Sequence, residues 1–334
     1  MNKTYDQVFD GCLIKPRGIV YVTGPSGVGK SLFSIGLIES GLDPKRITVF
    51  DNESSLQQHH ESMPGGLFGH YYNMTEIRIR EKGLFGTPAD LVDMVHSRVE
   101  QLPDGETDVI VLDNAVPFED AIQALVETRP EEFGYTRGQI EGMSAVKWGP
   151  IKKTYSSFLQ LISDGRKAKL AFVTTQLSQA FAGKQPMPGV YKPQGKADIL
   201  TQAATMRLWL LPSGNPVPDA LILKSRMVYP KHTGDSIQWQ EVLPKKLSPA
   251  TWPHIIEYLK KPPAKVPANE VPTALEMAIL RGTMTPDQLK LYRMLVQSSI
   301  SPDAEGEEGL AETKPGKSTS KAPSNVAEFI VAVT

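Results

Sequence analysis

The sequence predicts an α/β fold with a mainly parallel central sheet that is flanked by helices. Between residues 18 and 211, short and continuously apolar segments alternate with amphipathic helical segments. Continuous apolar strands are typical of a parallel sheet that is covered on both faces. The predicted strands are Gly18–Thr23, Ile47–Asp51, Asp108–Asp113 and Leu170–Thr175, and the predicted helices are Ser31–Gly41, Pro88–Leu102 and Ile151–Asp164.

After Thr205 the pattern changes to strands without intervening helices, which we expect to extend the sheet as antiparallel hairpins. These strands are Thr205–Leu211, Ala220–Lys224 and Ser236–Val242, and a short helix over Pro253–Leu259 follows them. We therefore predict a core over residues 1–260 and a linker with a small helical appendage over residues 261–300. The appendage contains Thr273–Leu280 and Pro286–Gln297. A Glu-, Lys-, Ser- and Pro-rich tail over residues 301–334 is expected to be disordered, with a short apolar end.

Composition indicates a soluble globular protein, with 40% hydrophobic and 22% charged residues. The formal net charge of −1 means that any nucleic-acid site must be a local basic patch. Cys12 is the only cysteine, which excludes an intrachain disulfide and fits a reducing compartment. The polar N-terminus lacks a secretory signal, and no apolar run reaches the roughly 20 residues that span a bilayer. We expect a cytoplasmic protein without membrane contact.

A glycine-rich segment between the first predicted strand and helix, GPSGVGKS, matches the Walker A pattern G-x-x-x-x-G-K-[ST]. Its glycines allow the backbone to wrap around a phosphate chain, with N–H groups and the helix N-terminus facing the anion. In this motif Lys30 neutralises the β- and γ-phosphates, and the Ser31 hydroxyl ligates Mg²⁺. The predicted nucleotide-binding residues are Gly24, Pro25, Ser26, Gly27, Val28, Gly29, Lys30 and Ser31.

Polar residues at the ends of other predicted strands complete the hypothesis of a nucleotide-hydrolysing site. Asp113 ends an apolar strand, as a Walker B aspartate does, and would hold Mg²⁺ through a water. The next residue is Asn114, where helicase-like ATPases often carry a glutamate base, so the base must come from elsewhere. Gln176 directly follows the strand Leu170–Thr175, where its amide would sense the γ-phosphate.

Glu53 is the candidate general base, because it follows the second predicted strand. If that strand lies beside the P-loop strand, its carboxylate would lie over the γ-phosphate and activate a water. The alternative is that Glu53 caps a helix that begins near Ser54, since acidic residues favour the first turn of helices.

The segments GPSGVGKS, VFDNE, DVIVLDN and AFVTTQ resemble, in order and spacing, the conserved blocks of the RecA superfamily over residues 18–230. The resemblance implies a RecA-like P-loop core that uses ATP and Mg²⁺. It also implies that Glu53 is the catalytic glutamate, that Asp113 is the Walker B aspartate, and that Gln176 opens the second DNA-binding loop. The chain looks closest to compact phage-encoded RecA-like ATPases, including those linked to single-strand annealing, which would function in the host cytoplasm.

The segment Leu223–Arg226 resembles the basic strand-end motif that reaches a neighbour's ATP in RecA-type oligomers. The resemblance implies that Lys224 and Arg226 contact ATP in trans, at the subunit interface of a homo-oligomer. The alternative is that they are two basic residues on an exposed strand.

Two segments combine glycines with cations and aromatic rings, as sequence-independent binding of single-stranded DNA requires. They are Glu131–Trp148 and Ser178–Ala197, and both are expected to be loops. The candidate DNA-binding residues are Arg137, Phe181, Lys184, Tyr191, Lys192 and Lys196. Trp148 is alternatively a core anchor for the helix that follows.

The leading hypothesis is a DNA-stimulated ATPase that acts on single-stranded DNA in phage-type recombination, annealing, repair or replication. The apolar end Val326–Thr334 contains FIVA, which fits an F-x-x-A docking pattern of some recombinases, so it is expected to bind another protomer or a replication or recombination partner. One alternative is a nucleotide-binding adaptor or loader with little turnover. Another is a small-molecule (nucleotide) kinase, because GPSGVGKS also resembles the P-loop of guanylate kinases.

Overall fold

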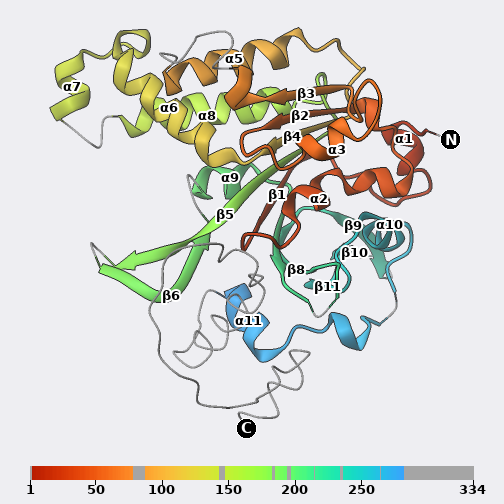
Figure 1. Ribbon diagram of the computed structural model, residues 1–334. Coiled ribbons are helices and arrows are strands. Elements are labelled where there is room, and N and C mark those ends of the chain that lie inside the picture. Colours follow the sequence, from red (N-terminus) through yellow and green to blue (C-terminus); the bar gives the residue numbers. More distant parts are fainter. Residues whose placement is uncertain are drawn as a thin grey trace, which may run out of the picture.

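The computed structural model describes residues 2–77, 87–142, 147–182, 185–193, 197–213, 215–233, 236–263 and 265–281. Its centre is a nine-stranded sheet in which eight strands follow the order β11-β8-β7-β1-β5-β4-β2-β3, while β6 pairs with β5 (Figure 1). The strands are β1 (Gly18–Gly24), β2 (Ile47–Asp51), β3 (His70–Asn73), β4 (Val109–Asp113), β5 (Leu170–Ala182), β6 (Gln185–Pro193), β7 (Met206–Leu211), β8 (Asp219–Ser225) and β11 (Lys246–Leu247).

Strand pairing confirms the mainly parallel sheet that the sequence predicts. The run from β7 through β1, β5, β4 and β2 to β3 is parallel throughout. β8 and β11 then extend the sheet in antiparallel pairing beyond β7. The antiparallel extension predicted after Thr205 is therefore correct for β8, whereas β7 itself runs parallel to β1.

Helices lie on both faces of this sheet (Figure 1). The α-helices are α1 (Tyr5–Val8), α2 (Lys30–Ile35), α3 (Gln57–Glu61), α5 (Pro88–Gln101), α6 (Ala115–Thr128), α7 (Arg137–Gly142), α8 (Trp148–Ser163), α9 (Ala197–Ala203), α10 (Trp252–Lys260) and α11 (Ala274–Arg281). Short 3-10 helices are η1 (Gly36–Ser40), η2 (Pro44–Arg46), η3 (Pro130–Phe133) and η4 (Ala268–Glu270). The helix predicted over Ser31–Gly41 is thus divided into α2 and η1, and α6 is a helix that the sequence analysis missed.

The apolar strands separate two hydrophobic cores because alternate side chains point to opposite faces. In β1, Val20 and Val22 belong to the core beneath α1, α2 and α10, whereas Ile19 and Tyr21 belong to the core beneath α5, α6 and α8. Trp252 of α10 is fully buried in the first core. Burial on both faces explains why these strands read as continuously apolar in the sequence.

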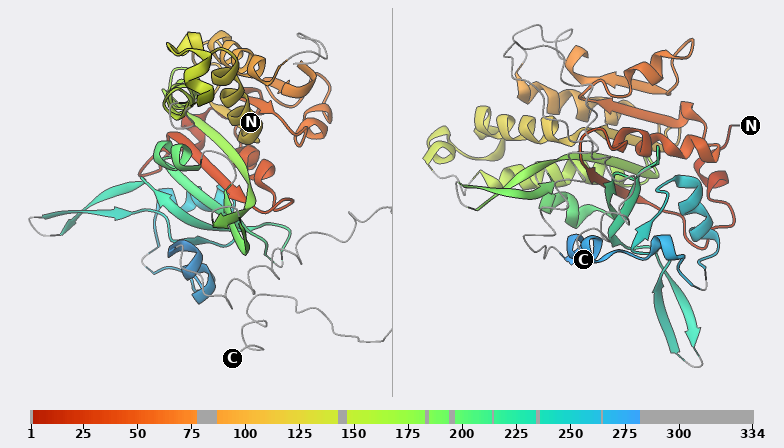
Figure 2. Two further views of the ribbon diagram at one scale, coloured as in Figure 1. Left: turned by 90° about the vertical axis from the view of Figure 1, so that its left-hand side faces the viewer. Right: turned by 60° about the horizontal axis from the view of Figure 1, so that its bottom comes forward.

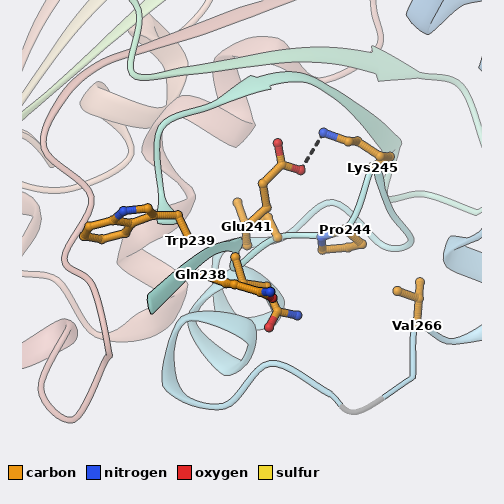
Figure 3. Close-up of a pocket in the computed structure, with 8 residues that line it drawn as sticks. Gln238, Trp239, Glu241, Pro244, Lys245 and Val266 are labelled. Carbon is orange, nitrogen blue, oxygen red and sulfur yellow. Dashed lines mark hydrogen bonds and ion pairs between the residues drawn. The ribbon is translucent and has the colours of Figure 1, made fainter. Parts of the chain in front are cut away.

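A separate antiparallel hairpin projects from this body (Figure 2). It consists of β9 (Val228–Thr233) and β10 (Ser236–Glu241), which pair with each other. The prediction that Ser236–Val242 extends the central sheet is therefore wrong, because β10 takes its hydrogen bonds from β9 instead. Figure 3 shows a pocket of about 510 Å³ that is lined by β10 and the residues after it. There Lys245 forms an ion pair with Glu241 at 2.5 Å, and the ring of Trp239 points away from this pair.

Buried acidic residues attach the segment after α10 to the rest of the structure. The Glu270 carboxylate, which is 1% exposed, contacts His254 and Tyr258 of α10. In α11, Glu276 forms an ion pair of 2.9 Å with Lys246 of β11. The predicted domain boundary at residue 260 stays a prediction, and the expectations for residues 282–334, including the FIVA segment, lie outside the described residues.

Within the part of the chain that the structure describes, no helix combines the length and the apolar character needed to cross a membrane.

A partly buried ion pair joins the residues just before β2 and β4, at the amino ends of these strands, and it provides a test of the fold. Arg46 Nε donates to Asp108 Oδ2 at 2.5 Å, and this contact raises the pKa of Arg46. The Asp108 side chain is 4% exposed. We expect Arg46→Ala to lower the free energy of unfolding by about 2 kcal/mol in urea, because it leaves a buried carboxylate without its charge partner.

Lys15→Ala is the matched control, since the Lys15–Asp6 pair is solvent-exposed. It should change the unfolding free energy by less than about 0.5 kcal/mol. Equal effects of the two substitutions would contradict the structural role of the Arg46–Asp108 pair.

Candidate nucleotide-binding site

The predicted site residues come together at the carboxyl edge of the parallel strands. In the strand register, Gly24 at the end of β1 lies opposite Gln176 of β5, and Asp51 at the end of β2 lies opposite Asp113 at the end of β4. Carboxyl ends of parallel strands meet at one edge of a sheet, where open α/β folds carry their ligand sites. Since β5 pairs with both β1 and β4, Gln176 stands between the glycine-rich loop and Asp113.

The glycine-rich loop has the backbone conformation that its glycines were predicted to allow. Gly27 and Gly29 have φ angles of 74° and 91°, a region that side chains with a Cβ rarely occupy. Val28 packs against the core, while Ser26 is exposed. One side of the loop is therefore fixed by packing against the core, and the other side is open to solvent. Pro25 lies between Gly24 and Ser26, and Ser31 is the second residue of α2.

The ammonium group of Lys30 is folded back onto this loop. Lys30 is 9% exposed, and its Nζ donates to the carbonyl oxygens of Gly24 at 3.3 Å and Pro25 at 2.7 Å. Burial lowers the pKa of Lys30, and the charges of Asp113 and Glu53 oppose that shift. The cation therefore lies within electrostatic reach of both predicted catalytic carboxylates.

Asp113 is a buried carboxylate with a hydroxyl group on each oxygen. It is 2% exposed, Ser55 Oγ donates to its Oδ2 at 2.6 Å, and the Thr174 hydroxyl contacts its Oδ1. Ser55 and Thr174 are contacts that the sequence analysis missed, because a single hydroxyl in a loop or strand gives no pattern.

Glu53 is held by two amide side chains. Gln176 Nε2 donates to Glu53 Oε1 at 2.9 Å and to Oε2 at 3.2 Å, and Asn114 Nδ2 donates to Oε1 at 3.0 Å. Glu53 is otherwise exposed. The alternative in which it caps a helix near Ser54 is not what the structure has, since the next helix, α3, begins at Gln57.

The assumption that β2 lies beside the P-loop strand is wrong. β5 and β4 stand between β2 and β1 in the sheet. The loop after β2 nevertheless carries Glu53 back across the end of β4 to Gln176 on β5. The backbone N–H of Asn52 donates to the carbonyl oxygen of Asp113 at 2.6 Å, and its side-chain Nδ2 donates to the carbonyl oxygen of Asn114 at 2.7 Å. These two hydrogen bonds join the ends of β2 and β4.

The shape of the loop that carries Glu53 depends on Asp51, which the sequence analysis did not single out. Its fully buried carboxylate accepts the backbone N–H groups of Glu53 at 3.0 Å, Ser55 at 3.2 Å and Leu56 at 2.8 Å. The Tyr71 hydroxyl donates to the same group at 2.9 Å. Burial, together with the Asp51 charge, raises the pKa of the Tyr71 phenol far above its usual range.

The basic pair Lys224 and Arg226 lies at the other end of the sheet. The end of β8 pairs with the beginning of β7, which is the amino edge of the parallel strands. Lys224 Nζ donates to the carbonyl oxygens of Thr201 at 2.6 Å and Gln202 at 3.2 Å, and Arg226 donates to Gln202 at 3.0 Å. Both cations therefore bind the last turn of α9, and they cannot contact the P-loop of the same chain.

The two predicted DNA-binding loops have regular structure. The first contains η3 and α7, with Arg137 as the first residue of α7. Trp148 begins α8 and is 40% exposed, so the alternative that it anchors the core is wrong. The second is a hairpin in which β5 continues past Gln176 and pairs with β6. Phe181 lies in β5, Tyr191 and Lys192 lie in β6, and Lys184 and Lys196 lie outside the described residues.

Comparisons with known proteins add no family to this geometry. No protein-family model matches the chain. A search of curated proteins finds no relative either.

The Asp51 carboxylate provides a test of how the Glu53 loop is held. We expect Asp51→Asn to lower the free energy of unfolding by about 2–3 kcal/mol, because the new NH₂ group faces buried donors that lose their acceptor. Chemical denaturation followed by tryptophan fluorescence measures this loss.

Asp43→Asn is the control, since Asp43 is only partly buried, accepts the Lys45 N–H at 3.0 Å and caps η2. Asparagine caps as well as aspartate does, so the expected change is below about 0.5 kcal/mol. A similar small change for Asp51→Asn would refute the role of Asp51 in holding the loop.

Proposed function

We propose that this protein binds and hydrolyses ATP with a RecA-like P-loop core and acts on single-stranded DNA in phage-type recombination, annealing, repair or replication. The observation that carries the proposal is the convergence of a Walker A loop, a buried aspartate and an amide-held glutamate at one sheet edge. Lys30, Asp113, Glu53 and Gln176 come from four separate segments of the chain. A structural ion pair needs two such residues, whereas phosphate chemistry needs all of these roles.

Each side chain has a role that suits its surroundings. Lys30 exchanges its two loop carbonyls for phosphate oxygens and neutralises their charge. Glu53 accepts the proton of a water as the water oxygen bonds to the γ-phosphorus and the bond to the ADP leaving group breaks. Its exposure allows that water to reach it. Gln176 senses the γ-phosphate from its place between Gly24 and Glu53.

The residues present suit a magnesium ion. Among the described residues, no three His, Cys, Asp or Glu side chains form a metal cluster. Mg²⁺ does not require one, because it binds through one or two carboxylates, phosphates and waters. Ser31 and Asp113 offer the oxygen donors that it prefers, and the hydroxyl groups of Ser55 and Thr174 hold the two Asp113 oxygens in place. When bound, the ion would neutralise charge on the phosphates.

Strand β5 supports the assignment to DNA. It carries Gln176 beside Glu53 and then continues without a break to Ala182, into a hairpin that extends away from the body (Figure 1). A change at Gln176 on loss of the γ-phosphate is therefore transmitted along one strand to the hairpin with Phe181, Tyr191 and Lys192. Aromatic and basic residues of this kind bind strands without regard to sequence.

A homo-oligomer with ATP at its subunit interfaces follows from the same proposal. Lys224 and Arg226 lie at the opposite edge from the P-loop, so they can serve an ATP site only in a neighbouring protomer. There they would stabilise the charge of phosphoryl transfer.

Steady-state ATP hydrolysis, measured with and without single-stranded DNA, tests the proposal. We expect DNA to stimulate the wild-type protein, and Lys30→Ala and Glu53→Gln each to lower the DNA-stimulated rate by about 100-fold or more. Lys169→Ala, a substitution at the residue just before β5 and at the other edge of the sheet, is the control and should keep the rate.

Two outcomes would overturn the proposal. A rate that ignores DNA and survives Glu53→Gln excludes both the base and the DNA assignment. Transfer of the γ-phosphate to a nucleoside monophosphate, rather than to water, would instead establish the kinase alternative.

A further inference from the structure

Asn114 follows Asp113, at the position where helicase-like ATPases carry a glutamate base. Asn114 is buried, with 3% of its surface exposed. Its amide makes two contacts of different kinds. Oδ1 accepts the Val116 N–H at 3.0 Å and thereby caps α6. Nδ2 donates to Glu53 Oε1 at 3.0 Å.

The first contact fixes the second. An amide group has one accepting and one donating end, so the capping bond to Val116 leaves Nδ2 as the end that faces Glu53. The Asn114 carbonyl is held as well, by the side chain of Asn52 at 2.7 Å. The donor toward Glu53 is therefore oriented by an α-helix and by the neighbouring strand end, independently of the nucleotide.

We infer that Asn114 is a positioning residue that holds the carboxylate of the general base Glu53 in a fixed orientation, an inference that rests on the proposed function. Gln176 is the second donor to Glu53, but it is also the amide that would turn to the γ-phosphate. When Gln176 leaves, Asn114 is the amide that still directs the Glu53 carboxylate. A chain with its base in the loop after β2 thus uses the residue that follows Asp113 as a donor rather than as the base.

Two substitutions at residue 114 keep the cap of α6 while removing the donor. Serine and aspartate both cap helices through oxygen, but neither donates to Glu53 as the amide does. We expect kcat for ATP hydrolysis to fall about tenfold or more in Asn114→Ser and Asn114→Asp, with KM for ATP within about threefold.

A double-mutant cycle separates positioning from a structural role. In a Glu53→Gln background, Asn114→Ser should cause less than about a twofold further loss, because it acts through Glu53. Single-turnover hydrolysis measures the low rates, and a fluorescent ATP analogue shows that each variant still binds nucleotide. Asn114→Ser adds no charge, so it keeps the test decisive if Asn114→Asp fails to fold.

The outcomes distinguish the two levels of the claim. Loss of activity in Glu53→Gln, together with wild-type kcat in Asn114→Ser, overturns the positioning role and leaves the proposed function standing. Equal losses from Asn114→Ser with and without Glu53 also overturn it. A wild-type protein without ATP hydrolysis overturns the proposed function, and the inference with it.

Discussion

The pairing of β5 between β1 and β4 is the constraint on which the candidate site depends. A strand in that position brings Gln176 level with the end of β1, which precedes the glycine-rich loop, on one side and beside β4 on the other. If β4 paired directly with β1, no strand would carry an amide between Lys30 and Glu53. The order also separates β2 from β1 by two strands, so Glu53 must cross the end of β4 to reach the site. Parallel pairing throughout this run is what places all of these ends at one edge.

The loop that carries Glu53 across the end of β4 is stabilised by hydrogen bonds that favour this one conformation. The Asp51 carboxylate accepts hydrogen bonds from three backbone N–H groups of the loop. Asn52 links the loop to the end of β4 by donating to the carbonyl groups of Asp113 and Asn114. Buried backbone and carboxylate groups are costly when they lack partners, so these bonds strongly favour one loop conformation. The exposed Glu53 side chain is thus carried by a loop whose backbone is fixed. The proposed role as general base needs this, because the carboxylate must remain within reach of a water.

The sequence predicts structure best where a single physical requirement decides which residue types can occur. Strands buried on both faces must be continuously apolar, which is why β1, β2 and β4 could be predicted closely. Only the buried first half of β5 could be predicted in this way, because the strand continues to Ala182 beyond the predicted end at Thr175. The glycine-rich loop could be predicted because positive φ angles at Gly27 and Gly29 call for glycine. Lys30 could be proposed from the G-x-x-x-x-G-K-[ST] pattern, and Asp113, Glu53 and Gln176 could be proposed from their places at or just after strand ends. The structure brings them to one edge of the sheet.

Features that depend on strand order or on long-range pairing could not be predicted in the same way. Nothing local shows that β2 pairs with β4 rather than β1, or that β10 pairs with β9 away from the central sheet. Asp51 resembles any polar residue at a strand end until the buried N–H groups around it are known. Helix α6 had a usable signal, since Phe118, Ile122 and Leu125 have helical spacing after the capping Asn114, and the sequence analysis overlooked it.

A crystal structure with a non-hydrolysable ATP analogue and Mg²⁺ would test most directly whether this sheet edge is a nucleotide site. The account predicts that the β- and γ-phosphates lie in the loop from Gly24 to Ser31. It also predicts that Lys30 Nζ leaves the carbonyl groups of Gly24 and Pro25 for a phosphate oxygen, while Asp113 and Ser31 face the metal. An analogue bound elsewhere on the protein, with Lys30 still on its two carbonyl groups, would contradict the account.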